Sequence, residues 1–355
     1  MPDSAKKNAK SYRKSFWPRH NPIVPQDSNV FAGSDVLITG GLGFIGSALA
    51  RRLVGLGAKV TLVDSLIPEY GGNRFNIHDI RDRVIVDPTD VRDAVSMARL
   101  IKKRQFLFNL AGQTSHLDSM TDPITDLNIN AAAQLQILEA CRLHNRDLKI
   151  VFASTRQVYG RPQYLPVDEK HPINPVDVNG INKLAGEWYH LLYNDVYGIR
   201  ACALRLTNTY GPGMRVKDAR QTFLGIWIRQ LIEQKPIQVF GTGEQRRDFN
   251  FVSDVVDALL LAGVSSNSDG QVFNLGHREH VSLQELAEML VRISGSGRYQ
   301  LIPFPEDRKA IDIGDYYSDF VKIESTLGWS PQTTLEDGLK TTLEYYRQNY
   351  AHYWD

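Results

Sequence analysis

The hydrophobic positions of the chain fall into short apolar runs separated by longer segments with helical spacing. Between residues 35 and about 206, runs rich in Val, Ile, Leu and Phe alternate with Ala/Leu/Ile-rich segments. Short apolar runs are typical of buried strands, and the spaced segments are typical of helices. Their alternation predicts βαβ units and hence a parallel sheet. Strands are expected at 35–39, 59–63, 84–86, 106–112, 149–153 and 200–206, and helices at 128–144 and 184–193.

The pattern becomes irregular beyond Asn208. A helix is expected at 223–233, and a short strand at 237–240 precedes a Gly-rich turn. Two amphipathic helices are expected at 282–293 and 335–348, the first with Ser282 as its N-cap.

These elements predict an α/β protein with a doubly wound parallel (Rossmann) sheet and a smaller C-terminal α/β substrate lobe. The first domain is expected to span 34–206, with 251–280 returning to it, and the lobe to combine 207–250 with 281–355. Residues 1–33 are polar and basic, and we expect a flexible or surface-docked arm. Three aromatic residues of this arm are candidates for contacts with the body or a second subunit: Tyr12, Phe16 and Trp17.

One stretch after the first expected strand carries four glycines within seven residues. It has the sequence T-G-G-L-G-F-I-G at 39–46, which fits both G-x-G-x-x-G and the related G-x-x-G-x-x-G. Glycines at this spacing allow a tight turn, close approach of the backbone to a pyrophosphate, and packing of helix on strand. The helix that follows offers free N–H groups to the phosphates. The next strand ends at Asp64, about 20 residues on, where an acid binds the adenosine ribose hydroxyls. The stretch therefore predicts a dinucleotide site.

Composition excludes several classes of function. The 41 basic and 40 acidic residues leave the chain nearly neutral, which argues against bulk binding to nucleic acid or to an anionic membrane. No apolar run approaches the length of a transmembrane helix, and the basic N-terminus lacks the apolar core of a secretory signal. The two cysteines, Cys141 and Cys202, lie in apolar stretches, so we expect buried reduced thiols and a cytoplasmic protein. No metal site is predicted.

Several ordered motifs give the chain a resemblance to a known family. They are T-G-G-L-G-F-I-G at 39–46, Asp64, Asp90–Val91, N-L-A-G-Q at 109–113, S-T-R-Q-V-Y-G at 154–160, K-L-A-G-E at 183–187, L-R-L-T-N-T-Y-G-P at 204–212 and R-D-F at 247–249. In this order they resemble the extended short-chain dehydrogenase/reductase family, specifically its nucleotide-sugar epimerases, dehydratases and decarboxylases. The resemblance runs from about Asp35 to Tyr346.

The resemblance implies a tightly bound NAD that oxidises a sugar hydroxyl and later returns the hydride. Asp64 favours NAD over NADP, because a carboxylate repels a 2′-phosphate. Asp90 and Val91 would flank the adenine. The cofactor-binding residues implied by the motifs are Gly40, Gly43, Phe44, Ile45, Gly46, Asp64, Asp90, Val91, Leu110, Ala111, Gly112 and Lys183.

The resemblance also implies roles in catalysis and in substrate binding. Thr155 matches the Ser/Thr that hydrogen-bonds the reacting hydroxyl, and Lys183 matches the lysine that holds the nicotinamide ribose and lowers the pKa of the catalytic base. Arg247 and Asn208 match residues near the nucleotide diphosphate, and an arginine fork suits that task because it pairs phosphate oxygens bidentately. Arg215 matches an arginine near the sugar carboxylate of uronate enzymes, with a surface or phosphate contact as the alternative. The implied substrate-binding residues are Gln113, Asn208, Arg215 and Arg247.

One position departs from the family pattern. The family's base is a tyrosine four residues before the lysine, where this chain has Asn179, and no Tyr-x-x-x-Lys occurs anywhere in it. A carboxamide forms hydrogen bonds but cannot carry a proton near neutral pH. Three explanations stay open: another base, with Thr155, His116 or Tyr159 as candidates; a substitution that traps a complex; or a protein that binds nucleotides without turnover.

The motif after Thr155 bears on the type of reaction. Dehydratases that carry this Thr follow it with Asp–Glu, whereas here Arg156–Gln157 follow, and neither can act as acid or base in eliminating water. We therefore expect an epimerase that acts through a transient keto-sugar on a UDP-sugar, with 4-epimerisation of a UDP-uronate as one form. The alternatives are a UDP-glucuronate decarboxylase and an NAD- or nucleotide-sugar-binding protein without catalysis. The family also implies a homodimer, paired through helices near 128–144 and 183–195.

Overall fold

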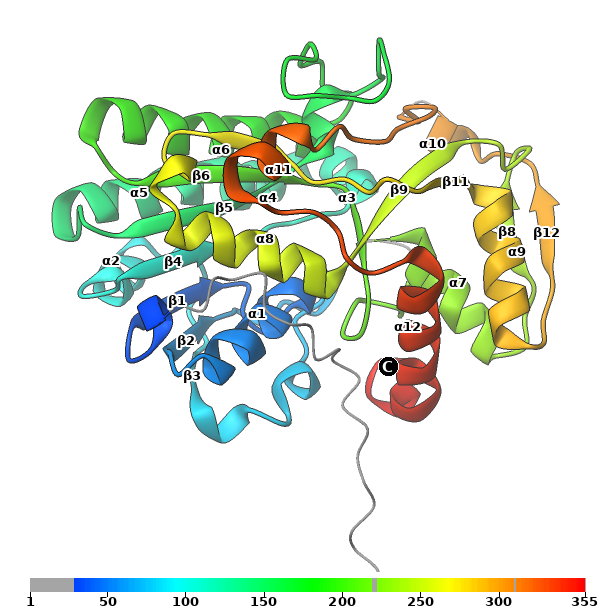
Figure 1. Cartoon of the computed structure of the whole chain (residues 1–355), viewed down its shortest axis with the longest axis horizontal. Coiled ribbons are helices and arrows are strands. Elements are labelled where there is room, and N and C mark those ends of the chain that lie inside the picture. The colour runs from blue at the N-terminus through cyan, green and yellow to red at the C-terminus, as the bar shows by residue number, and fades with distance from the viewer. Residues whose placement is uncertain (1–28, 219–221, 310, 355) are drawn as a thin grey trace, which may run out of the picture.

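The computed structural model describes residues 29–218, 222–309 and 311–354, and Figure 1 shows the arrangement of their helices and strands. The α-helices are α1 (Phe44–Gly55), α2 (Ala94–Ile101), α3 (His116–Thr121), α4 (Pro123–Leu127), α5 (Ala133–His144), α6 (Val178–Tyr197), α7 (Phe223–Ile232), α8 (Val252–Val264), α9 (Leu283–Ser294), α10 (Glu306–Lys309), α11 (Val321–Leu327) and α12 (Leu335–Asn349). The strands are β1 (Asp35–Thr39), β2 (Lys59–Val63), β3 (Val84–Asp87), β4 (Phe106–Asn109), β5 (Lys149–Thr155), β6 (Ala201–Leu206), β7 (Asn208–Tyr210), β8 (Ile237–Phe240), β9 (Arg246–Phe251), β10 (Val272–Asn274), β11 (His280–Ser282) and β12 (Tyr299–Ile302).

Seven parallel strands form the central sheet in the order β10-β6-β5-β4-β1-β2-β3. Strand order reverses at β1, which pairs with β2 on one side and with β4 on the other. In open α/β sheets the ligand crevice lies beyond the carboxyl ends of the strands at such a reversal. The predicted doubly wound sheet is confirmed, and its topology places the crevice where β1 and β4 end.

Helices cover both faces of the central sheet, and side chains of each strand alternate between two cores. From β1, Val36 and Ile38 join a core with residues of α1 and α8, while Leu37 joins the opposite core with residues of α2 and α5. In Figure 1, α8 crosses the near face of the sheet. Alternation of this kind explains why the inner strands have few polar residues, since both of their faces are buried.

Two smaller sheets complete the fold beside the crevice. One has the order β11-β9-β7, and the other pairs β12 with β8. Their strands of three to six residues lie on the side of the molecule that also carries α7, α9 and α12 in Figure 1. The strand β10, by contrast, joins the central sheet beside β6.

Several sequence expectations met a different outcome. The expected helix 128–144 begins as a π-helical turn, η5 (Asn128–Ala132), before α5, and the helix expected at 184–193 starts earlier, at Val178. Asp177 is the reason for the second difference, because its side chain caps the backbone N–H of Gly180.

At the start of the described chain, Phe31 is fully buried against the ring of Phe106, so this residue of the expected arm packs on the body. Tyr12, Phe16 and Trp17 lie outside the described residues.

Other expectations were confirmed. Ser282 caps α9 through a full capping box with Glu285. Cys141 and Cys202 are free and buried, and burial raises the pKa of the Cys141 thiol to about 12. No helix within residues 29–218, 222–309 and 311–354 combines the length and the apolar character that crossing a bilayer requires.

Candidate active site

A cavity of about 860 Å³ lies at the carboxyl ends of the central strands and extends under β8 and β9. This volume is near the upper end of the range for small-molecule and cofactor sites. Sixteen of the eighteen expected site residues line it: Gly40, Gly43, Phe44, Ile45, Gly46, Asp64, Asp90, Val91, Leu110, Ala111, Gly112, Thr155, Asn179, Lys183, Asn208 and Arg247. The other two, Gln113 and Arg215, belong to the described chain but lie outside the lining.

The glycine turn between β1 and α1 has the geometry that a dinucleotide requires. Gly40 has φ +68°, and a Cβ there would press on the backbone of Ala111 at 3.1 Å. A Cβ on Gly46 would collide with the carbonyl oxygen of Gly40, so α1 packs on the turn only because this residue has no side chain. Gly43 precedes α1 without a side-chain cap. The first N–H groups of this helix are therefore left for a pyrophosphate at the cavity wall.

Asp64 and Asp90 lie on the same wall. The two oxygens of the Asp64 carboxylate accept hydrogen bonds from the backbone N–H groups of Leu42 (2.9 Å) and Leu66 (2.9 Å). Burial raises the pKa of Asp64, and these N–H groups partly oppose the rise. Asp90 is held by a bidentate contact from Arg92, which lowers the pKa of its carboxyl group.

Lys183 on α6 is buried beside Gly112, where a Cβ would lie 2.7 Å from the Lys183 Nζ. The ammonium group donates to the carbonyl oxygen of Ala153 (3.2 Å) and lies 5.0 Å from the centre of the Phe152 ring. Burial lowers the pKa of Lys183 to about 8, against the attraction of Asp126. The Lys183 ammonium group is thus almost inaccessible to water. Among the described residues, only one oxygen accepts a hydrogen bond from it.

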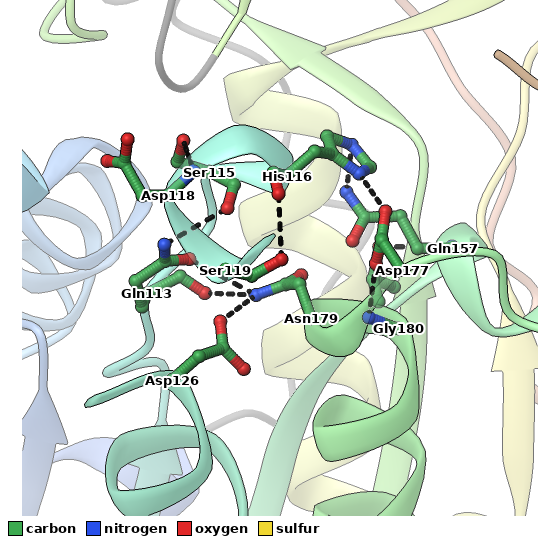
Figure 2. A network of polar contacts seen from close by, with 11 residues as sticks. Gln113, Ser115, His116, Asp118, Ser119, Asp126, Gln157, Asp177, Asn179 and Gly180 are labelled. Carbon is green, nitrogen blue, oxygen red and sulfur yellow. Dashed lines mark hydrogen bonds and ion pairs between the residues drawn. The ribbon is translucent and has the colours of Figure 1, made fainter. Parts of the chain in front are cut away.

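Asn179 is locked into the wall of the cavity rather than extended into it. Its amide nitrogen donates to the backbone oxygen of Gln113 (2.7 Å), to the Gln113 Oε1 (3.2 Å) and to the Asp126 Oδ2 (2.8 Å). Asn182 donates to the other oxygen of the fully buried Asp126 (2.8 Å). Figure 2 shows Gln113 and Asp126 converging on Asn179. The side chain at position 179 ties three segments together and carries no titratable group.

The three candidates for another base lie in different surroundings. Tyr159 is fully buried outside the lining, and its hydroxyl donates to Asn274 (2.7 Å) and accepts from Arg205 (2.6 Å). Burial raises the pKa of Tyr159 to about 12, which removes it as a base at neutral pH. Thr155 and His116 both line the cavity. The Thr155 Oγ1 accepts from the Gln157 backbone N–H (3.2 Å), and the His116 ring contacts the Gln157 side chain.

A buried arginine, Arg247, lines the far end of the cavity. Arg247 on β9 donates to the carbonyl oxygens of Arg246 (2.8 Å) and Gly314, and its Nη2 lies 3.9 Å from an oxygen of Asp312. Burial and the nearby Arg156 lower the pKa of Arg247 to about 10.

Asn208 donates to the backbone oxygen of Asp248 (2.9 Å). Arg215, expected near a sugar carboxylate, does not line the cavity; it is paired with Asp218 (2.6 Å), which does.

Arg156 is a further residue of the site. The sequence excluded it as an acid or base in eliminating water and indicated no other role for it. It lines the cavity one residue after Thr155, with its guanidinium 5.0 Å from the centre of the Tyr316 ring. Within the described residues it makes no hydrogen bond or ion pair. Burial lowers its pKa. Asp126, Asn130 and Asp177 were also missed. The only sequence signal among these was Asp177, whose type and place before a helical segment are typical of an N-cap.

Comparison with known proteins agrees with this geometry. Residues 36–276 match the model of the NAD dependent epimerase/dehydratase family. A putative UDP-glucose 4-epimerase of Methanocaldococcus jannaschii is 34% identical over 323 residues, which cover 88% of this chain and 99% of that protein. UDP-glucuronic acid decarboxylase 1 of Xenopus tropicalis is 30% identical over 337 residues, covering 89% of this chain and 73% of that protein.

Solved structures show the same architecture. The UDP-glucose 4-epimerase of Thermotoga maritima, solved with UDP-glucose, superposes with a TM-score of 0.81 at 30% identity and covers 89% of this chain and 99% of its own. The UDP-glucuronic acid 4-epimerase of Bacillus cereus, solved with UDP-glucuronic acid and NAD, gives a TM-score of 0.79 at 28% identity, with coverage of 89% and 100%. The family model matches more than half of the chain, and the glycine turn, the parallel sheet and the cavity agree with this match. The chain therefore belongs to the NAD dependent epimerase/dehydratase family.

Proposed function

We propose that the protein is a nucleotide-sugar epimerase that acts on a UDP-sugar through a transient keto-sugar. One observation carries the proposal: Thr155 and Lys183 line the same continuous cavity as the glycine turn at one end and Arg247 at the other. A dinucleotide and a nucleotide sugar would then meet at Thr155. The glycine turn and Asp64 would hold NAD, and NAD, when bound, supplies the hydride acceptor. In this reading residues 34–206 with 251–280 form the cofactor domain, and the remainder forms the substrate lobe.

Three residues of the cavity would have separate roles in the reaction. Thr155 would hydrogen-bond the reacting sugar hydroxyl from the end of β5. Lys183 would place a positive charge beside the nicotinamide ribose, in surroundings where little water screens it. Arg247 would grip the diphosphate, because its guanidinium is already oriented by backbone carbonyl oxygens.

A specific observation favours an anionic sugar as the substrate. Arg156 directly follows Thr155 and faces the cavity without a hydrogen-bonded partner among the described residues. A carboxylate on the sugar would supply that partner, so the role first assigned to Arg215 passes to Arg156. The substrate would then be a UDP-uronate, and 4-epimerisation would be the reaction. Substitution Arg156→Met should raise the KM for UDP-glucuronate at least about tenfold and leave UDP-glucose unaffected; Arg215→Met serves as the control. Equal losses for both sugars would contradict the assignment.

The proposal is tested by product analysis. The protein is incubated with NAD and a panel of UDP-, CDP- and dTDP-sugars that includes UDP-glucuronate, and products are identified by mass spectrometry and NMR. An isomer of unchanged mass supports the epimerase. Loss of carbon dioxide supports the runner-up, a UDP-glucuronate decarboxylase. Binding of cofactor and sugar nucleotide with no product from any sugar would support a binding protein instead.

We also propose a homodimer in the cytoplasm. The outer face of α6 carries a stripe of exposed apolar residues at helical spacing: Ile181, Trp188, Leu192 and Val196. Leu127 of α4 and Leu143 of α5 are exposed as well. Apolar stripes of this kind mark protein interfaces, and a second copy placed on α5 and α6 would cover this one.

A further inference from the structure

We infer that His116 carries the proton in the proposed reaction and that Asp177 positions it. This inference rests on the proposed function, because it assigns the proton-carrying group of that reaction. Position 179 lacks a titratable side chain, and Tyr159 is enclosed elsewhere. His116 is the first residue of α3, and its partly exposed ring lines the cavity.

The Asp177 carboxylate fixes the orientation of the ring. One of its oxygens accepts from the backbone N–H of Gly180 (2.7 Å) and so starts α6, and the other contacts the His116 Nδ1. Figure 2 shows the ring in contact with both Asp177 and Gln157. Because Asp177 is ionised, it orients the Nδ1–H and leaves Nε2 as the nitrogen that gains or loses a proton. Lys183 lies on α6, the helix that Asp177 caps, so one element positions both Asp177 and the lysine.

Gln157 is suited to both protonation states of the ring. Its amide nitrogen faces the His116 Nε2, and its Oε1 is buried with no hydrogen-bond partner among the described residues. In this orientation the amide donates to the lone pair of a neutral imidazole. A half-turn of the same amide would present the oxygen to the N–H of an imidazolium, since the two ends of an amide are nearly alike in shape. A purely structural contact would need only one of these states.

In the proposed reaction, His116 takes up the hydroxyl proton and NAD takes up the hydride. The hydroxyl of the reacting sugar carbon takes the place of the Gln157 amide at Nε2. The O–H proton passes to Nε2 while the hydrogen on carbon leaves with two electrons for NAD, and the C–O bond becomes C=O. Return of the hydride to the opposite face and of the proton to oxygen gives the epimer. Thr155 would hold the same oxygen, since its Oγ1 accepts from the backbone of the residue that contacts His116.

The charged groups that face the dyad are few. Asp177 is in contact with the ring, and Arg156 acts on Asp177 from the η6 segment (Arg156–Tyr159). Asp118, also on α3, points away from the ring in Figure 2. Burial would raise the pKa of Asp177, but its hydrogen bond and attraction to His116 lower the pKa overall, so Asp177 is ionised at neutral pH.

The experiment compares wild type with His116→Gln, Asp177→Asn and the control His144→Gln, an exposed histidine at the end of α5. Formation of reduced nicotinamide in a single turnover, product NMR, UDP-sugar affinity and the titration of the His116 ring by NMR are measured over a range of pH. We expect His116→Gln to slow hydride transfer about 10²-fold or more, to abolish the acid limb of the pH profile, and to change the UDP-sugar Kd less than about threefold. Asp177→Asn should shift that limb and the ring titration, and His144→Gln should change neither.

The outcomes separate this inference from the function on which it rests. Retention of the wild-type rate and acid limb in His116→Gln would overturn it, as would a ring that takes up no proton over the pH range of activity. A wild-type protein that is silent while Asn179→Tyr turns over would also overturn it, yet would leave the nucleotide-sugar assignment standing. Silence from both, with ligands bound, would overturn the proposed function and this inference together.

Discussion

Replacing Lys183 by methionine should stabilise the cofactor-free protein while it removes the activity. Burial lowers the pKa of Lys183 from 10.5 to about 8, so folding disfavours its charged form. A shift of this size corresponds to about 3 kcal/mol at neutral pH. Methionine has a similar volume and no charge, but it loses the hydrogen bond to Ala153 and the contact with the Phe152 ring, together about 1–2 kcal/mol. The net gain in the free energy of unfolding should be about 1–2 kcal/mol.

The pH dependence supplies the sign test for this prediction. Between about pH 8 and 10.5 the unfolded chain holds the Lys183 proton and the folded chain does not, so wild-type stability rises with pH across that window. The advantage of Lys183→Met should therefore be complete below about pH 8 and shrink above it. Urea denaturation of both proteins without NAD measures the difference, with Lys59→Met, at the exposed first residue of β2, as control. A Lys183→Met protein less stable than wild type at neutral pH, or an advantage that does not change up to about pH 10, would refute the reasoning.

Three further predictions concern the turn, the interface and the core. Gly46→Ala should weaken NAD binding at least about tenfold in calorimetry, because its Cβ would displace the Gly40 carbonyl, whereas Gly55→Ala on the same helix meets no atom within 4 Å and should be neutral. Trp188→Glu should convert a dimer to monomers in light scattering, while Val95→Glu, 83% exposed on α2, should not; a monomeric wild type would contradict the proposed interface. Arg205→Met should cost about 3–5 kcal/mol in urea denaturation, since it leaves the fully buried Glu187 without its ion pair, and a loss no larger than that of the exposed pair variant Arg278→Met would be inconsistent with this.

The sequence predicted six of the seven strands of the central sheet, and its inner strands are the clearest because both of their faces are buried. Each is a short, almost purely apolar run, and the glycine turn after β1 marks the crevice by itself. The short strands β7, β9, β10, β11 and β12 were not predicted. Arg246–Phe251, for instance, mixes arginine, aspartate and asparagine with phenylalanine, because Asp248 accepts a hydrogen bond from Thr207 and Asn250 donates one to the backbone oxygen of Gly276. The spacing of apolar residues does not indicate hydrogen bonds of this kind.

The site residues also fall into those that the sequence predicted and those that it did not. The glycines, Lys183, Thr155 and Arg247 belong to contiguous motifs, and the cavity brings them together. Asp126 and Asn130 could not be found in this way, since neither is part of a motif, and Asn130 reaches Gln113 from a π-helical turn that side-chain pattern does not encode. Arg215 was expected at the substrate because of its motif. The structure pairs it with Asp218, a local contact that spacing alone does not reveal.

The surroundings of Asn179 bear on which explanation of this residue is correct. Three oxygen acceptors converge on its amide nitrogen, and one of them belongs to Asp126, a fully buried carboxylate that also accepts from Asn182. A tyrosine would offer these acceptors a single O–H and would bring a large ring into the same wall. The two N–H donors of an asparagine match the site better than one hydroxyl does. Asn179 is thus a built part of this wall, which argues against a substitution that traps a complex. The proposed function then requires another proton carrier, and among the candidates from the sequence His116 alone combines a place in the cavity lining, a titratable ring and an ionised partner.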